Sequence, residues 1–82
     1  MIETILFSAS WCGPCKTLKK YAKDNDISFT SVYDIDTEEG AELSALHGIR
    51  GVPTVITLSN STELSRFTGM NIDKLNKIKE TK

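Results

Sequence analysis

The two cysteines of this chain, Cys12 and Cys15, stand where the hydrophobic pattern changes from that of a strand to that of a helix. Residues 2–9 are apolar and rich in β-forming side chains, which predicts a buried strand. From Cys15 onward, apolar side chains recur at helical spacing, as at Leu18 and Ala22. A strand that leads directly into a helix is typical of α/β domains, in which chemistry collects at the carboxyl ends of the strands.

The rest of the chain continues this alternation of strands and helices. The pattern predicts strands at 27–35, 54–58 and 62–68, a helix that follows 36–39 and ends at Gly48, and a last helix capped by Asn71. Within the second strand, Phe29, Tyr33 and Ile35 are expected to share one face. The order βαβαββα predicts a four-stranded mixed sheet with three flanking helices, a parallel first pair of strands and a final hairpin.

Length and composition indicate one small domain over residues 1–82. The net charge is −1, and the basic residues are dispersed apart from a loose group on the first predicted helix, which we interpret as a solvated face. That group comprises Lys16, Lys19, Lys20 and Lys23. On this charge distribution we expect no nucleic-acid partner. The sequence contains no apolar run of membrane-spanning length and no signal peptide at its start, so we expect a cytoplasmic protein without a membrane partner.

The cysteine pair allows three interpretations: a zinc site, a structural disulfide or a redox pair. A zinc site needs at least three ligands, and the single histidine, His47, is distant in sequence and is expected to be an exposed residue at a helix end. A structural disulfide between Cys12 and Cys15 would close a very short loop and would add little stability, and cytosolic thiols are kept reduced. A redox pair is therefore the favoured interpretation, with no metal.

A redox interpretation gives the two cysteines different roles. Cys12 precedes or opens the first helix, where backbone N–H groups and the helix dipole favour a thiolate. The dipole lowers a thiol pKa of about 8.5 by roughly one unit, which brings Cys12 near neutrality, where an attacking thiol is most effective. Cys15 lies one turn later, is expected to be shielded, and would resolve the mixed disulfide. Pro14 suits a first helical turn, and Gly13 leaves the backbone open to an approaching protein.

Two motifs resemble the thioredoxin family. The segment WCGPCK at residues 11–16 is similar to the active-site signature of that family, and GIRGVPT at 48–54 resembles its segment with a cis-proline. Gly69 is a looser third match. The resemblance covers nearly the whole chain and implies an α/β thioredoxin-like fold of glutaredoxin size, without the N-terminal strand and helix of full-length thioredoxins.

The resemblance also implies a site. Pro53 would be cis and adjacent to the cysteines, and the backbone of Val52 would pair with an extended client segment. Trp11 would belong to the docking surface, although a partly buried packing role is a close alternative. The implied catalytic residues are Cys12 and Cys15. The implied substrate-binding residues are Trp11, Gly13, Pro14, Val52, Pro53 and Gly69.

Three functions remain open at this point. The first is a monomeric dithiol reductant with no bound cofactor, which a flavin-containing, NADPH-dependent thioredoxin reductase recharges and which serves clients such as ribonucleotide reductase. The second is a glutathione-dependent, glutaredoxin-like enzyme, to which residues 67–73 bear a faint likeness. The third is a non-catalytic thioredoxin-like assembly factor.

One position departs from the family pattern. Thioredoxins usually carry a buried aspartate six residues before the first cysteine, and here that position is Leu6. The family aspartate is thought to relay the proton of the resolving cysteine. We therefore hypothesise that this chain loses some resolving rate and gains a better-packed core at Leu6, because apolar residues in place of a buried ion pair can stabilise a core.

Overall fold

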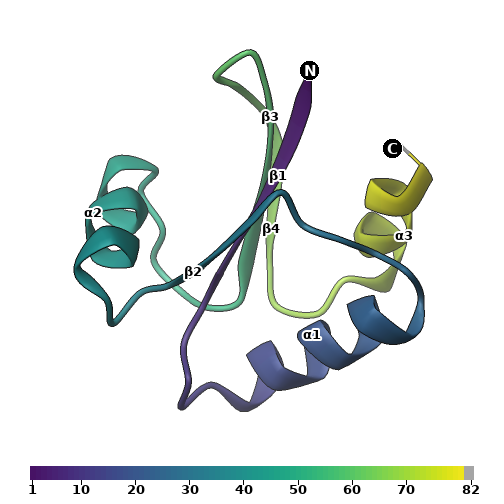
Figure 1. The fold of residues 1–82 in the computed structure, drawn as a ribbon, viewed down its shortest axis with the longest axis horizontal. Helices are drawn as coiled ribbons and strands as arrows, with labels where there is room; N and C mark the ends of the chain where they lie inside the picture. The colour runs from purple at the N-terminus through teal and green to yellow at the C-terminus, as the bar shows by residue number, and fades with distance from the viewer. Residues whose placement is uncertain (81–82) are drawn as a thin grey trace.

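The computed structural model describes residues 1–80 and contains four strands and three helices (Figure 1). In chain order these are β1 (Ile2–Ser8), α1 (Gly13–Asp24), β2 (Ser31–Asp34), α2 (Glu38–Leu46), β3 (Thr54–Ser59), β4 (Thr62–Thr68) and α3 (Ile72–Glu80). The order βαβαββα is the one that the sequence pattern predicts, so the expected fold class is confirmed.

The strands form one mixed sheet in the order β2-β1-β3-β4, with β1 in its interior. β1 is parallel to β2, with Leu6 opposite Val32, and antiparallel to β3, with Leu6 opposite Val55. β3 and β4 form the expected antiparallel hairpin. Its tight turn is possible because Asn60 and Ser61 both adopt positive φ, as a two-residue hairpin turn requires.

Helices cover both faces of the sheet, with α1 and α3 on one side and α2 on the other (Figure 1). Each face holds a separate apolar cluster. The α1/α3 cluster contains Leu6, Leu18, Ala22, Ile27, Val55, Leu75 and Ile78. The α2 cluster contains Ile5, Phe7, Ile56 and Leu58, with Tyr33, Ile35, Leu43, Ile49 and Val52 packed against it. Successive β1 residues therefore alternate between the two clusters, as strand geometry dictates.

Polar side chains define where the last two helices begin. Thr37 caps α2, because its hydroxyl oxygen accepts the Gly40 N–H at 3.0 Å. Asn71 caps α3 in the same way, with its side-chain oxygen 3.1 Å from the Lys74 nitrogen. Gly40 is buried in the first turn of α2, where an added Cβ would collide with the carbonyl oxygen of Asp34. The start of α2 therefore packs directly on the end of β2.

The second strand is shorter than the pattern predicts, since β2 covers residues 31–34 rather than 27–35. The amide of Ile27 donates to the carbonyl of Ala22 at 2.8 Å, so the chain is still tied to the end of α1. The expected common face is also wrong. Phe29 packs against the α1/α3 cluster, whereas Tyr33 and Ile35 pack against the α2 cluster. Strand alternation holds only within a strand, and Phe29 lies before β2 begins.

Candidate functional site

The cysteines form a disulfide at the junction between β1 and α1. Cys12 is the N-cap residue of α1, and its Sγ atom accepts a hydrogen bond from the Cys15 N–H at 3.1 Å. Cys12 is 5% exposed and Cys15 only 1%, and both pack with Ala9, Ile35 and Val52. Cys15 is therefore shielded as expected, and Cys12 is also buried in the disulfide form.

The start of α1 supplies the electrostatics of this site. Once the disulfide is reduced, a Cys12 thiolate at the N-cap would sit at the positive end of the helix dipole. The same N–H group that now meets its sulfur would stabilise that negative charge. Pro14 lies in the first turn, where its missing N–H costs no helical bond. This arrangement suits Cys12 to attack and leaves Cys15 behind it.

The second part of the site is the segment between α2 and β3, which we call the cis-proline loop (residues 48–53). The Val52–Pro53 peptide bond is cis, as the family resemblance implies. The Val52 carbonyl oxygen lies 3.7 Å from Cys12 Sγ. Pro53 is buried, and its carbonyl oxygen accepts the Gly69 N–H at 2.8 Å. The loop therefore brings Val52 against the disulfide, although the two are distant in sequence, and Gly69 is bonded to the adjacent Pro53.

Trp11 stands at the surface beside the disulfide, 66% exposed, so the packing alternative is not what the structure shows. Its indole N–H donates to a carboxylate oxygen of Asp36 at 2.8 Å. The sequence pattern places Asp36 only at the start of the second predicted helix and does not indicate its contact with Trp11. A usable signal existed, because Asp36 follows β2 at the sheet edge where β1 also ends.

A hollow of about 150 Å³ adjoins this surface. Its walls come from the tryptophan, the end of β2, α2 and the cis-proline loop. The lining residues are Trp11, Ile35, Ser44, Ile49, Arg50, Gly51 and Val52. A side chain of a bound protein could enter this hollow while its backbone lies along the loop.

The remaining sequence candidates lie outside this cluster. His47 is the C-cap residue of α2 as expected, but it is half-buried rather than exposed, because its ring packs towards Phe7 with a centroid distance of 6.1 Å. Leu6 is fully buried in the α1/α3 cluster. The four grouped lysines of α1 are exposed. Among residues 1–80, no three His, Cys, Asp or Glu side chains gather as metal ligands, and no helix is long and apolar enough to cross a membrane.

Comparisons with known proteins agree with this geometry. The family profile described as thioredoxin matches residues 2–81. Thioredoxin H2-1 of Oryza sativa is 35% identical over 78 residues, which cover 93% of this chain and 56% of the relative. The chain thus spans little more than half of that relative's length.

Two solved structures extend the similarity to three dimensions. The thioredoxin of Fasciola hepatica superposes with a TM-score of 0.75 at 29% identity, covering 99% of this chain and 81% of its own. A chain from the complex of ferredoxin:thioredoxin reductase with thioredoxin f2 gives a TM-score of 0.76 at 26% identity, covering 98% and 76%.

Proposed function

The chain belongs to the thioredoxin family, and we propose that it is a thiol-disulfide oxidoreductase that reduces disulfide bonds in client proteins. One observation carries the proposal. The Cys12–Cys15 disulfide sits at the N-terminus of α1, with the Cys15 N–H on Cys12 Sγ and the cis-proline loop against the same sulfur. This arrangement combines a stabilised thiolate, a nearby second thiol and a backbone edge for a client.

The proposed reaction moves two electrons from the dithiol to the client. The Cys12 thiolate attacks one sulfur of the client disulfide, and the client S–S bond breaks as a Cys12–client bond forms. The first client sulfur leaves as a thiolate. Cys15 then loses its proton to water and attacks Cys12 Sγ, which releases the second client thiolate. The products are a reduced client and the Cys12–Cys15 disulfide, so no bound cofactor is needed within the chain.

We assign client binding to the surface around the disulfide. An extended client segment would pair with the backbone at Val52, because main-chain pairing gives affinity without demanding a particular sequence. Trp11, held by Asp36, would provide a flat apolar contact. The other proposed contact residues are Gly13, Pro14, Pro53 and Gly69.

The proposed partners follow the family pattern. A flavin-containing, NADPH-dependent thioredoxin reductase would return electrons to the disulfide, and ribonucleotide reductase is one candidate client. A reductase partner is supported by the structural neighbour solved with ferredoxin:thioredoxin reductase. We further propose that the protein acts as a monomer in the cytoplasm, without a nucleic-acid or membrane partner.

Insulin reduction in parallel reactions tests this proposal. One reaction contains NADPH and a thioredoxin reductase, a second contains glutathione with glutathione reductase, and a third contains dithiothreitol. We expect turnover in the first and third. We also expect Cys12→Ser to abolish turnover and Cys15→Ser to accumulate a covalent mixed disulfide with the client.

Each alternative has its own outcome. Turnover in the second reaction and not in the first would reassign the chain as glutaredoxin-like. Full turnover by Cys15→Ser would contradict the dithiol mechanism. Inactivity in all three reactions, together with biological function that survives Cys12→Ser, would favour an assembly factor.

A further inference from the structure

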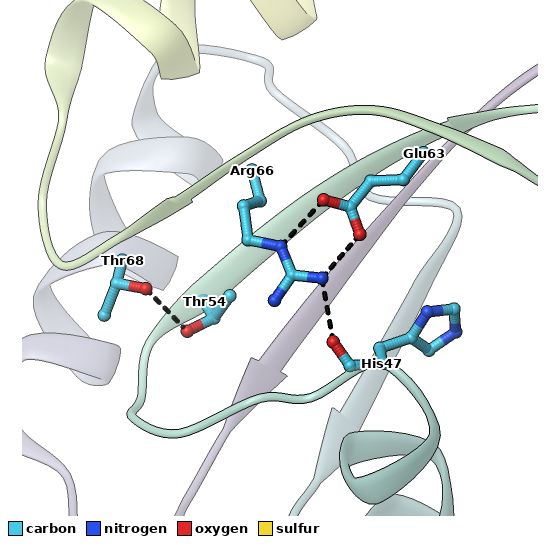
Figure 2. A network of polar contacts seen from close by, with 5 residues as sticks. All are labelled: His47, Thr54, Glu63, Arg66 and Thr68. Atoms are coloured by element: carbon cyan, nitrogen blue, oxygen red, sulfur yellow. Dashed lines mark hydrogen bonds and ion pairs between the residues drawn. The ribbon is translucent and has the colours of Figure 1, made fainter.

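Strand β4 contacts the two residues that flank the cis-proline loop, His47 before it and Thr54 after it, through side chains on one face. Arg66 lies opposite Ile56 and Thr68 lies opposite Thr54 in the sheet register, so both side chains point to the face that α2 covers. Figure 2 shows the two contacts side by side, with Arg66 reaching His47 and Thr68 reaching Thr54. These residues lie outside the disulfide and outside the expected client-binding set.

The Arg66 contact fixes the point where the loop leaves α2. Its Nη2 atom donates to the His47 carbonyl oxygen at 2.8 Å. That carbonyl belongs to the last turn of the helix, where main-chain acceptors lack partners within the helix. The guanidinium group also donates to Glu63, whose carboxylate oxygens lie 2.7 Å from Nε and 2.5 Å from Nη2. This bidentate contact with Glu63 sets the orientation of the Arg66 side chain.

The direction of the loop depends on this helix end. Gly48 adopts a left-handed conformation with φ of 64°, and the Ile49 amide bonds back to the Ser44 carbonyl at 2.8 Å. This is the Schellman arrangement, which passes from a helix into the next segment through one rigid turn. By binding the His47 carbonyl oxygen, Arg66 therefore fixes the direction in which the cis-proline loop leaves α2.

The Thr68 contact fixes the other end of the loop. The Thr54 hydroxyl donates its only proton to the Gly51 carbonyl oxygen at 2.6 Å. In the 3.1 Å contact between the two hydroxyls, Thr68 must therefore be the donor. The resulting chain of bonds runs from Thr68 through Thr54 to the backbone of the loop, next to Val52.

We propose that Arg66 and Thr68 are positioning residues, which hold the cis-proline loop at the distance from Cys12 that a client strand requires. The inference rests on the proposed function, because it concerns the binding of a protein disulfide. Neither side chain would touch the reacting sulfurs. Loss of either would loosen the backbone at Val52, whose carbonyl lies 3.7 Å from Cys12 Sγ. Clients that pair with this backbone would bind less well, whereas a small disulfide would be unaffected.

The test compares a protein disulfide with a small one. Arg66→Met removes the guanidinium group and keeps the stem, and Thr68→Val removes the hydroxyl with little change of shape. For each variant we expect KM for insulin to rise about three- to tenfold with kcat nearly unchanged. The rate with 5,5′-dithiobis(2-nitrobenzoate) and the reduction potential should equal those of the wild type. Arg66→Lys, which retains one donor group, should restore part of the loss in KM.

Controls separate positioning from folding. Lys20→Gln removes an exposed ion pair with Asp24 on α1, away from the loop, and should leave KM unchanged. Thermal unfolding of each variant shows whether the folded fraction accounts for any loss. An unchanged KM in both β4 variants would overturn the inference while the proposed function stands, and so would equal losses on both disulfides. A wild type inactive toward both disulfides would overturn the proposed function, and the inference with it.

Discussion

The two faces of the sheet are held by different kinds of contact. Under α1 and α3, a continuous apolar cluster encloses Leu6 and Val55. Under α2 there is one helix, a smaller cluster and the polar network of Arg66, Glu63 and Thr68. Apolar burial is strong but has no preferred direction, whereas hydrogen bonds fix particular atoms at particular distances. The first face therefore contributes mainly apolar burial, and the second fixes the course of the cis-proline loop.

The largest expected loss of stability comes from a charge placed in the α1/α3 cluster. Leu6→Asp places a carboxyl group at a fully buried position and should cost more than about 3 kcal/mol of unfolding free energy. Burial raises the pKa of such a carboxyl group, so the variant should lose further stability as pH rises and the group ionises. Urea unfolding between acidic and neutral pH measures both effects. Leu6→Asn, polar but never charged, should show the loss without the pH dependence.

The same variant tests the hypothesis that Leu6 exchanges resolving rate for packing. Provided that enough protein folds, the pH profile of insulin reduction should differ between Leu6→Asp and the wild type. Unaltered stability together with an unaltered pH profile would contradict the hypothesis.

A smaller effect is expected where α2 meets β2. Gly40→Ala adds a methyl group that collides with the Asp34 carbonyl oxygen, and the neighbouring atoms are backbone that cannot easily yield. We expect a loss of about 1–3 kcal/mol, as in other overpacked sites. Gly13→Ala is the matched control for stability, because nothing lies within 4 Å of a Cβ there. Chemical unfolding should show destabilisation at Gly40 alone, and equal results would mean that α2 can shift without cost.

The smallest effect concerns the ion pair on the α2 face. The hydrogen bond from Arg66 lowers the pKa of Glu63 below its ordinary value of 4.5. The folded state therefore holds the proton less tightly than the unfolded chain. The resulting stabilisation is complete above about pH 4.5 and disappears as pH falls through the folded-state pKa. Glu63→Gln should be slightly less stable than the wild type at neutral pH and equal to it in acid, and a constant difference would contradict this assignment.

The fold could be predicted from the sequence because its local signals agree with one another. Thr37 and Asn71 mark helix starts, Gly48 marks a helix end, and the β-branched residues of β3 precede a polar turn. The predicted start of the second strand at residue 27 is wrong. Ile27 is a β-branched residue typical of strands, but its amide donates to the carbonyl of Ala22 at the end of α1. Strand propensity does not indicate whether a backbone amide is already hydrogen-bonded to the end of a helix.

The candidate site was predictable only in part. Cys12 and Cys15 are neighbours in sequence, and the motif at 48–54 identified the cis Val52–Pro53 bond. The contact between Trp11 and Asp36 depends on two side chains that meet across 25 positions. Arg66 and the His47 carbonyl meet across 19. Such contacts depend on sheet register and side-chain rotamers, which periodicity alone does not specify.

The interior position of β1 has a consequence for synthesis. β1 is translated before both neighbouring strands, β2 and β3. Ile2 pairs with Ser59 of β3, so this pairing forms only after β3 has left the ribosome. The backbone that lies against Cys12 belongs to a loop made shortly before β3. Both cysteines are therefore made before the backbone that packs against Cys12 in the folded protein.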